Sequence, residues 1–243
     1  MRTAFYAGAS GLLANQKAMD NIANNVANVS TNGYKPQNVS FQSLIYDEMY
    51  VNTPTDPEKG HGVKTEINDT NFTPSSLLPT NYDLDFAITS NALFAVEQDG
   101  LTAYTRAGNF SVGMDGETGY LVTQNGDFVL DKNGNRIVLE KQAGTNEFDT
   151  SNLTNTIGLF TFANPNYLTP VAGNLYAVSN KSGEAVVVEN NYGQVIQGAL
   201  EQSGTNLADE MAEMITVQRA FQLAARVVST AEENQQTINQ LRR

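Results

Sequence analysis

The sequence of 243 residues contains a single histidine and no cysteine, so few of its side chains could perform catalysis. His61 stands between Gly60 and Gly62, and neighbouring glycines leave the backbone too free to hold an imidazole as a general base. A Ser-His-Asp or Cys-His arrangement needs a fixed base, and a histidine or cysteine metal site needs several such ligands. We therefore expect His61 to be an exposed linker residue, and we expect no catalytic residue, no bound metal and no cofactor.

Two groups of acidic residues are the remaining candidates for chemistry. Residues 131–135 resemble a calcium loop in composition, but a calcium loop carries glycine at its sixth position and glutamate at its twelfth, and this run does not. A hairpin turn explains it better. Asp83 and Asp85 suggest no pocket around them, so we interpret them as solvated. Residues 8–11 fall inside a helical pattern, which excludes a phosphate loop after a strand.

The composition is that of a globular chain with an acidic middle. Hydrophobic residues make up 40% and charged residues 16%, which excludes a disordered polymer. The formal net charge of −12 lies almost entirely in the middle of the chain, which holds most of the acidic residues, and the two ends carry little net charge. An acidic surface repels phosphates, so nucleic acid is not an expected partner. The apolar start of the chain continues into a helical pattern, so no cleaved signal peptide is expected.

Apolar residues at the start of the chain follow a helical spacing from residue 3 to about 29. The residues that recur every seven positions are Phe5, Leu12, Met19 and Val26. This spacing is typical of a helix that packs along one seam against another helix. The other faces are rich in asparagine, which can hydrogen-bond to neighbours without burying a charge. Asn32-Gly33 predicts the end of this segment.

The end of the chain repeats the pattern more strongly. Residues at sevenfold spacing are Leu200, Leu207, Met214, Phe221 and Val228, with Val217 and Ala224 three positions after members of that set. Asn206 or Thr205 is expected to cap the helix. A helix from 206 to 241 would be roughly 54 Å long at about 1.5 Å per residue, too long for a domain of this size to bury. Whether the two terminal helices pair within one subunit or between subunits stays open.

Between these helices the chain alternates strand candidates with turn signals. The strand candidates are residues 84–88, 120–123, 128–130, 136–139, 159–162 and 185–188, and the hairpin turns are Asp99-Gly100, Asn125-Gly126 and Asn133-Gly134. Residues 50–82 are rich in Thr, Asn, Pro and Gly, which indicates an extended linker. The sequence therefore predicts an α+β fold in four parts: an N-terminal helix and the motif after it (1–40), an extended linker (41–82), a mostly antiparallel β domain (83–197) and a C-terminal helix (198–243).

Three blocks of the sequence resemble flagellar rod and hook proteins. The run ANNVANVSTNGYK at 23–35 is similar to their N-terminal signature. Its signature residues are Asn24, Asn25, Ala27, Asn28, Gly33 and Tyr34. The second block is YTRAGNF at 104–110 with GYLVT at 119–123, and the third is QGALE at 197–201 with QRAF at 218–221. The resemblance covers both ends and the middle of the chain.

This resemblance implies a structural subunit of the flagellar basal body and not an enzyme. Many copies would stack helically with one another and with other rod and hook subunits. The terminal helices would form a coiled-coil-like axial domain, and the β domain would form the outer wall. Export through the flagellar type III apparatus without a cleaved signal peptide is implied, as are ring proteins around the rod as further partners. The residues expected to pack the axial helices are Phe5, Leu12, Met19, Val26, Leu207, Met214, Val217, Phe221, Ala224 and Val228.

Within this family, residues 41–46 resemble the segment after the signature in the distal-rod type, which forms the axial drive shaft between the motor and the hook. The chain also lacks the added outer domain usual in hook proteins. A proximal-rod subunit and a hook-type axial protein remain the alternatives. From another class, a secreted β-domain adhesin or carbohydrate-binding module could also carry a coiled coil. It would need an exposed groove of aromatic residues, and the tyrosines of the middle segment show no clustering that indicates one.

Overall fold

The chain has an α+β fold, and the computed structural model describes residues 2–44, 46–48, 58–116, 118–140, 148–189 and 194–241. It divides into two units, each with its own packing. The helical unit comprises residues 1–27, 37–69 and 206–243, and the β unit comprises residues 28–36 and 70–205. No helix in the described ranges is both long and apolar enough to cross a membrane.

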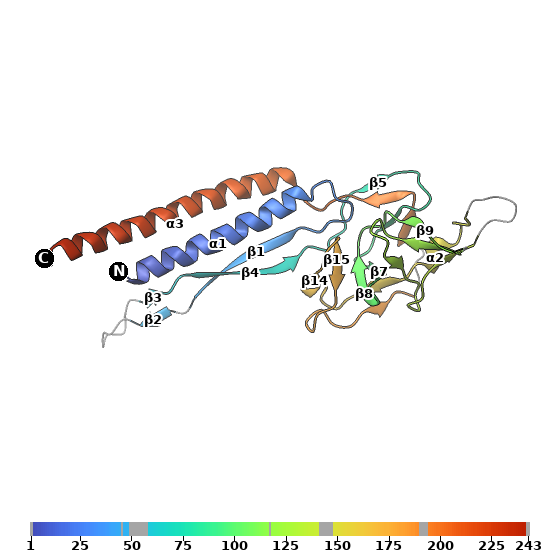
Figure 1. The fold of residues 1–243 in the computed structure, drawn as a ribbon, viewed down its shortest axis with the longest axis horizontal. Coiled ribbons are helices and arrows are strands. Elements are labelled where there is room, and N and C mark those ends of the chain that lie inside the picture. The colour runs from blue at the N-terminus through green and yellow to red at the C-terminus, as the bar shows by residue number, and fades with distance from the viewer. Residues whose placement is uncertain are drawn as a thin grey trace. The chain divides into compact units, whose positions relative to one another are not determined.

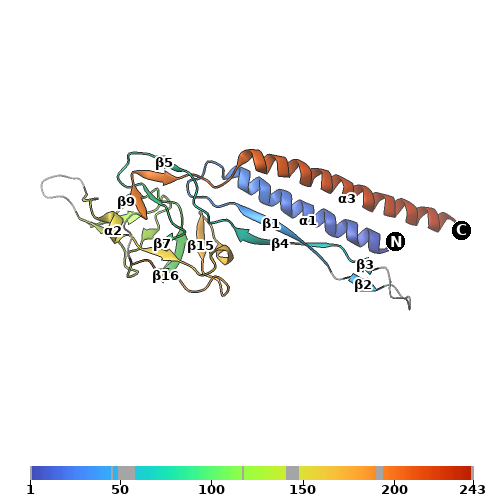
Figure 2. The same ribbon diagram turned by 180° about the vertical axis from the view of Figure 1, so that it is seen from behind.

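The helical unit consists of two long helices and a narrow strip of strands. Its elements are α1 (Arg2–Ala27), β1 (Gln37–Ser43), β2 (Tyr46–Glu48), β3 (Glu58–Gly60), β4 (Val63–Thr70) and α3 (Leu207–Leu241). Helices α1 and α3 lie side by side and antiparallel, and β1 and β4 run along another side of α1 (Figures 1 and 2). β1 pairs with β4, and β2 pairs antiparallel with β3.

Small residues of α1 let the two helices approach closely. A Cβ atom added to Gly8 would lie 2.9 Å from a methyl group of Val228, and one added to Gly11 would lie 3.7 Å from Ala224. The apolar core of this unit is formed by Ala18, Ile22 and Val217. The partly buried Met19, Val26, Val39 and Met214 pack around it. α1 is therefore held by van der Waals contact at short range along its small side chains.

The other side of α1 holds the start of β4. The Ser10 hydroxyl donates to the carbonyl of Ala7 at 2.8 Å and accepts from the amide of Val63 at 3.2 Å. Gly62 has φ +111°, and a Cβ atom there would lie 2.1 Å from the Ser10 hydroxyl oxygen. Only glycine fits this position, so Gly62 beside His61 is a packing residue of the helical unit.

The β unit is built from short antiparallel strands. They are β5 (Leu77–Pro79), β6 (Phe86–Ile88), β7 (Leu93–Gln98), β8 (Leu101–Thr105), β9 (Ser111–Asp115), β10 (Thr118–Val122), β11 (Phe128–Val129), β12 (Val138–Leu139), β13 (Leu159–Thr161), β14 (Thr169–Pro170), β15 (Leu175–Ala177), β16 (Val186–Val187), β17 (Val195–Gln197) and β18 (Ala199–Glu201). A short helix, α2 (Leu153–Thr156), and a 3-10 turn, η1 (Pro165–Tyr167), interrupt them.

One sheet carries most of these strands, in the order β12-β10-β11-β7-β8-β15-β14. β9 pairs with β10, β13 pairs with β7, and β16 pairs with β13. Two small pairs, β17 with β6 and β18 with β5, complete the unit. The β7–β8 hairpin turns through Asp99 and Gly100, which both have positive φ, as this dipeptide predicts. The strands expected near 86, 120, 128, 138, 159 and 186 are all present.

Aromatic and branched side chains fill the β unit. Phe86, Phe94 and Leu121 are fully buried, and the rings of Phe94 and Phe110 meet edge to face at 5.2 Å. This core lies on the inner faces of β6, β7 and β10. Burial of each large side chain there stabilises the folded unit by about 1.5–3 kcal/mol relative to leaving that side chain exposed.

Two expectations about the elements at the chain ends are wrong. Residues 50–82, expected to be an extended linker, contain the strands β3, β4 and β5 in their described part. Residues 199–201 form β18 and do not begin the C-terminal helix, so Leu200 is a buried strand residue. α3 begins at Leu207, where the Asn206 side-chain oxygen accepts from the amide of Ala208 at 3.1 Å. Asn206 is thus the expected N-cap.

We predict that a fragment of residues 28–205 folds alone and that a fragment of residues 40–195 does not. The shorter fragment lacks both β18 and the loop 28–36, which belong to the β unit. Thermal unfolding followed by far-UV circular dichroism should be cooperative for the longer fragment and non-cooperative for the shorter. Equal cooperativity in the two fragments would show that the chain ends are dispensable for this unit.

Candidate functional site

None of the residues first considered for chemistry forms a catalytic arrangement. His61 is exposed before β4, and Asp83 is exposed in a turn, whereas Asp85 is buried, so its interpretation as a solvated residue is wrong. The carboxylate of Asp131 accepts amide hydrogens from Asn133 at 2.7 Å and Asn135 at 2.8 Å, as a hairpin turn requires. In the part of the chain that the structure describes, no three acidic or histidine side chains gather as metal ligands.

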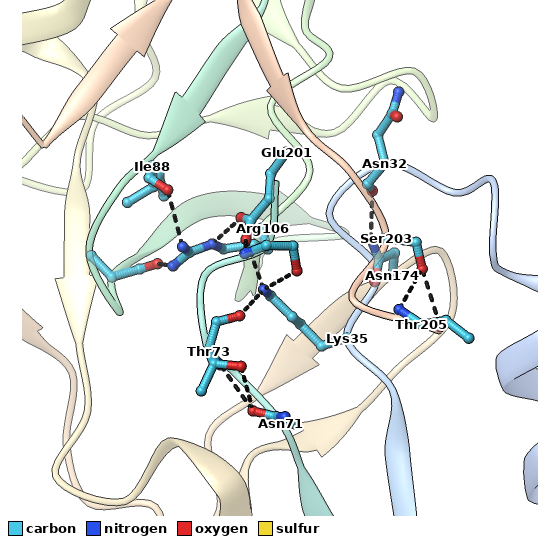
Figure 3. A network of polar contacts seen from close by, with 12 residues as sticks. Asn32, Lys35, Asn71, Thr73, Ile88, Arg106, Asn174, Glu201, Ser203 and Thr205 are labelled. Atoms are coloured by element: carbon cyan, nitrogen blue, oxygen red, sulfur yellow. Dashed lines mark hydrogen bonds and ion pairs between the residues drawn. The ribbon is translucent and has the colours of Figure 1, made fainter. Parts of the chain in front are cut away.

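The dominant polar feature of the β unit is a buried group of three charged side chains, here called the Glu201 cluster: Lys35, Arg106 and Glu201 (Figure 3). Lys35 Nζ lies 2.7 Å from Glu201 Oε1, and Arg106 Nε donates to Glu201 Oε2. All three side chains are fully shielded from solvent. One carboxylate therefore serves two cations, each on a different oxygen.

Each side-chain nitrogen of the Glu201 cluster also has a hydrogen-bond partner among the described residues. Lys35 Nζ donates to the carbonyl of Thr73 at 2.5 Å and to the hydroxyl of Ser75 at 3.3 Å. The guanidinium of Arg106 donates to the carbonyls of Ala92 and Ile88. These oxygens spread the one unbalanced positive charge over neutral dipoles. A buried network of this kind fixes the segments that it joins.

Burial is the main influence on Lys35. It lowers the pKa of the ammonium group, while the hydrogen bond and the charge of Glu201 act in the opposite direction. Without the carboxylate, two cations would remain in a space that excludes water. Removing one partner of a buried ion pair destabilises a protein by about 3–5 kcal/mol. Glu201 is thus the residue on which the other two depend.

The signature loop, residues 28–36, is held against the cluster by its backbone. The amide of Gly33 donates to the carbonyl of Glu201 at 2.8 Å, and the amide of Gly204 donates to the carbonyl of Tyr34 at 2.9 Å. Gly33 has φ +66°, and a Cβ atom there would lie 2.6 Å from the backbone of Arg106. Glycine is therefore required at position 33 for two reasons: its positive φ, and the close approach of the Arg106 backbone, which leaves no room for a Cβ atom. The signature does more than end a helix, since it packs into the β unit.

The helical unit has its own polar junction, at Asn25. Its side-chain oxygen accepts from the amide of Gln37 at 3.2 Å, and its nitrogen donates to the carbonyl of Gln37 and to Glu210 Oε1, both at 3.0 Å. Asn25 thus joins α1 to β1 and to α3. The second oxygen of Glu210 is buried and has no hydrogen-bond partner among the described residues.

The other signature residues play smaller parts in the structure. Asn28 accepts from the hydroxyl of Thr31 at 3.1 Å, which shapes the turn after α1. Asn24 and Ala27 are exposed on α1. Sequence reasoning selected Asn25 and Gly33 but passed over Lys35, Arg106 and Glu201, although each lies in one of the three blocks. The sequence signal for them is the presence of charged residues in all three blocks: Lys35 in the first, Arg106 in the second, and Glu201 with Arg219 in the third.

The residues expected to pack the axial helices fall into two groups. On α3, Val217 is buried, and Met214, Phe221, Ala224 and Val228 are partly buried. Leu207 is 42% exposed, and Phe5 on α1 is 36% exposed. Leu12, Met19 and Val26 are partly buried, beside the fully buried Ala14, Ala18 and Ile22. The seam of α3 thus faces α1 within the same chain, while the buried row of α1 has shifted from the sevenfold set to a fourfold one.

We predict that Glu201→Gln, which keeps the shape of the side chain and removes its charge, lowers the free energy of unfolding of the β unit by about 3–5 kcal/mol. The matched control is Glu97→Gln, whose carboxylate forms an exposed pair with Arg136 at 2.8 Å, and little change is expected there. Urea unfolding of the full chain, followed by tyrosine fluorescence, measures both. Similar small losses for the two variants would contradict the account of the cluster.

We also predict that the helical unit is most stable under acidic conditions. Burial raises the pKa of Glu210, the hydrogen bond from Asn25 opposes that shift, and Glu213 and Asp209 add to it. A carboxyl whose pKa is raised by folding takes up a proton as the unit folds. Its stability is therefore lost as pH rises from the usual carboxyl range through the raised pKa.

The measurement for this prediction is the urea midpoint of helical circular dichroism between pH 4.5 and pH 8 for the wild type and for Glu210→Gln. The amide variant should be more stable at neutral pH and should show a flatter pH dependence. Glu232→Gln, an exposed carboxylate on the same helix, is the control. An unchanged pH profile in Glu210→Gln would remove Glu210 as its source.

Comparison with known proteins places the three blocks in one family. Residues 5–35 match the family described as flagella basal body rod protein, residues 87–154 the flagellar hook protein FlgE/F/G D1 domain, and residues 196–241 the flagellar basal body rod FlgEFG protein C-terminal region. Each of these three ranges supplies one member of the Glu201 cluster. The cluster is therefore where all three matched regions meet.

Whole-chain relatives agree with this assignment. The chain is 32% identical over 267 residues to the flagellar basal-body rod protein FlgG of Bacillus subtilis (strain 168), with all of both chains covered. It is 31% identical over 264 residues to FlgG of Borreliella burgdorferi, again with full coverage. Identity to the rod protein FlgF of Caulobacter vibrioides is 28% over 253 residues, covering 99% of this chain and 98% of that protein. The chain belongs to the flagellar basal-body rod protein family.

Proposed function

We propose that this chain is a structural subunit of the distal-rod type, which polymerises helically into the axial drive shaft between the motor and the hook. The observation that carries this proposal is the similarity to FlgG proteins along the entire chain. Both terminal helices fall within the matched ranges. The similarity extends over the whole length of the chain, as expected for a subunit whose entire length takes part in packing.

The polar chemistry of the described residues supports a structural role. The charges that are buried together, in the Glu201 cluster, are paired with one another and hydrogen-bonded to main-chain and hydroxyl oxygens. Such a network is suited to rigidity, which a shaft that transmits torque requires. We accordingly propose that the chain catalyses no reaction.

The terminal helices are the proposed polymerising element, as a coiled-coil-like axial domain. Along α3 only Val217 is fully buried, and large apolar side chains remain exposed on other faces. A helix of this length gains most of its stability from packing, so neighbouring subunits are the natural source of the missing contacts. Other rod and hook subunits, the flagellar type III export apparatus and ring proteins around the rod are the proposed partners, with export requiring no cleaved signal peptide.

The alternatives are weaker on specific observations. A FlgF-type subunit is supported by the rod protein FlgF of Caulobacter vibrioides, at 28% identity, which is lower than the 32% identity to FlgG of Bacillus subtilis. An adhesin or carbohydrate-binding module needs a groove of several exposed aromatic residues, whereas Tyr104 and Tyr176 are buried in the core of the β unit and Tyr167 is exposed. Tyr192, also considered for such a groove, lies outside the described residues.

The proposed position in the rod is tested by removing the gene from its host and isolating basal bodies. We expect a rod that stops short of the hook, and we expect the wild-type gene to restore both the hook and swimming. Complete hooks in the strain without the gene would contradict the distal-rod assignment.

We predict that Met214, Phe221 and Val228 replaced together by aspartate block assembly and leave the β unit folded. Each aspartate replaces a partly buried apolar side chain of α3 by a charge, and Met214 and Val228 contact α1, so the substitutions remove apolar packing from this face and add charges that oppose its burial. Swimming in soft agar and the urea midpoint of the β unit are the two readouts. Normal swimming by the triple variant would show that this contact is not needed.

A further inference from the structure

The packing of the helical unit leaves one regular apolar row of α3 uncovered. We call it the α3 ridge: Leu207, Met211, Ile215, Arg219 and Leu223. Its members are spaced by four, and its four apolar side chains are between 42% and 61% exposed. Residues spaced by four form one of the ridges through which helices interdigitate. The ridge differs from the seam Met214–Val228, which is turned toward α1 in the same chain.

A second feature of the same unit is concave. A groove of about 520 Å³ lies between α1 and the strip of strands, lined by Lys17, Asp20 and Asn24 on α1, by Gln37 on β1, and by Thr65 and Glu66 on β4. We call it the α1 groove. From Lys17 to Asn24 it spans two turns of helix, about 10 Å. The part of the α3 ridge from Ile215 to Leu223 spans a similar length, about 12 Å.

The charges of the two features are complementary. Arg219 is the one charged residue of the ridge, and its side chain is exposed. The α1 groove carries Lys17, Asp20 and Glu66, so its net charge is −1. Two copies joined symmetrically, ridge against ridge, would bring their Arg219 side chains toward each other near the centre of the row, and like charges oppose that pairing.

We propose that the α3 ridge of one copy of this chain docks in the α1 groove of a second copy, with Arg219 between Asp20 and Glu66. The contact joins two different surfaces of the same unit. Each added copy therefore presents a free ridge and a free groove, and such a contact extends without closing. This inference rests on the proposed function and deepens it, because it assigns the surfaces through which subunits join.

Charge reversal tests the contact in a strain that lacks the chromosomal gene. Arg219→Glu alone and Asp20→Arg alone should each reduce the amount of this chain in isolated rods about tenfold, a loss within the range that close interfacial charge pairs produce. The double variant should restore most of it. Arg226→Glu, an identical change on an exposed residue of the same helix but outside the ridge, should leave the amount unchanged.

Cysteine cross-linking identifies the occupant, because the chain contains no cysteine of its own. Co-expressed Arg219→Cys and Thr65→Cys chains should form a disulfide between copies in assembled rods, and Arg226→Cys with Thr65→Cys should not. A disulfide between two Arg219→Cys chains would indicate a symmetric contact and overturn the proposal. So would a double charge variant no better than either single one, since Arg219 would then meet a different protein.

These results separate the inference from the proposed function. If the wild-type chain restores hook-bearing rods but the ridge and groove variants behave like wild type, only the docking inference fails. If the wild-type chain is absent from the rods, the proposed function fails with it.

Discussion

The carboxylate of Glu201, buried between Lys35 and Arg106, is the interaction on which the β unit depends. A carboxylate that is buried away from water must be paired with cations. Two neighbouring buried cations without this carboxylate would strongly destabilise the folded unit. The strand that carries Glu201, the signature loop that carries Lys35 and the end of β8 that leads to Arg106 must therefore form together. The unit is completed only when segments from near both ends of the chain are present.

This arrangement also defines where the terminal helices leave the β unit. The chain exits toward α1 before residue 28 and toward α3 after residue 205. Hydrogen bonds from Gly33 to Glu201 and from Gly204 to Tyr34 hold the two exits side by side. Joining them removes much of the loop entropy that pairing of the distant chain ends would otherwise cost. The buried cluster thus favours pairing of α1 with α3 within the chain.

The sequence predicted the α+β class, six of the strands, the hairpin turns and the cap at Asn206, because each of these depends on local periodicity or turn chemistry. It failed where tertiary contact overrides local pattern. Leu200 continues the sevenfold spacing of the C-terminal helix, yet it lies in β18, where it pairs with Leu78 of β5. Gly62 was read as linker, although it is required by Ser10, far away in the sequence. No local signal could show that Lys35, Arg106 and Glu201 meet, since they are separated by long stretches of chain. The resemblance of their three blocks to one family did not single them out either.

The central claim is that the signature loop is hydrogen-bonded to β18 and is an integral part of the β unit. Amide hydrogen exchange of Gly33 in the full chain tests it most directly, because this amide is the donor to the carbonyl of Glu201. The account predicts that Gly33 exchanges only by global opening, as slowly as the central amides of β7 and β8. Exchange of Gly33 at the rate of an exposed loop, while β7 and β8 stay protected, would contradict it.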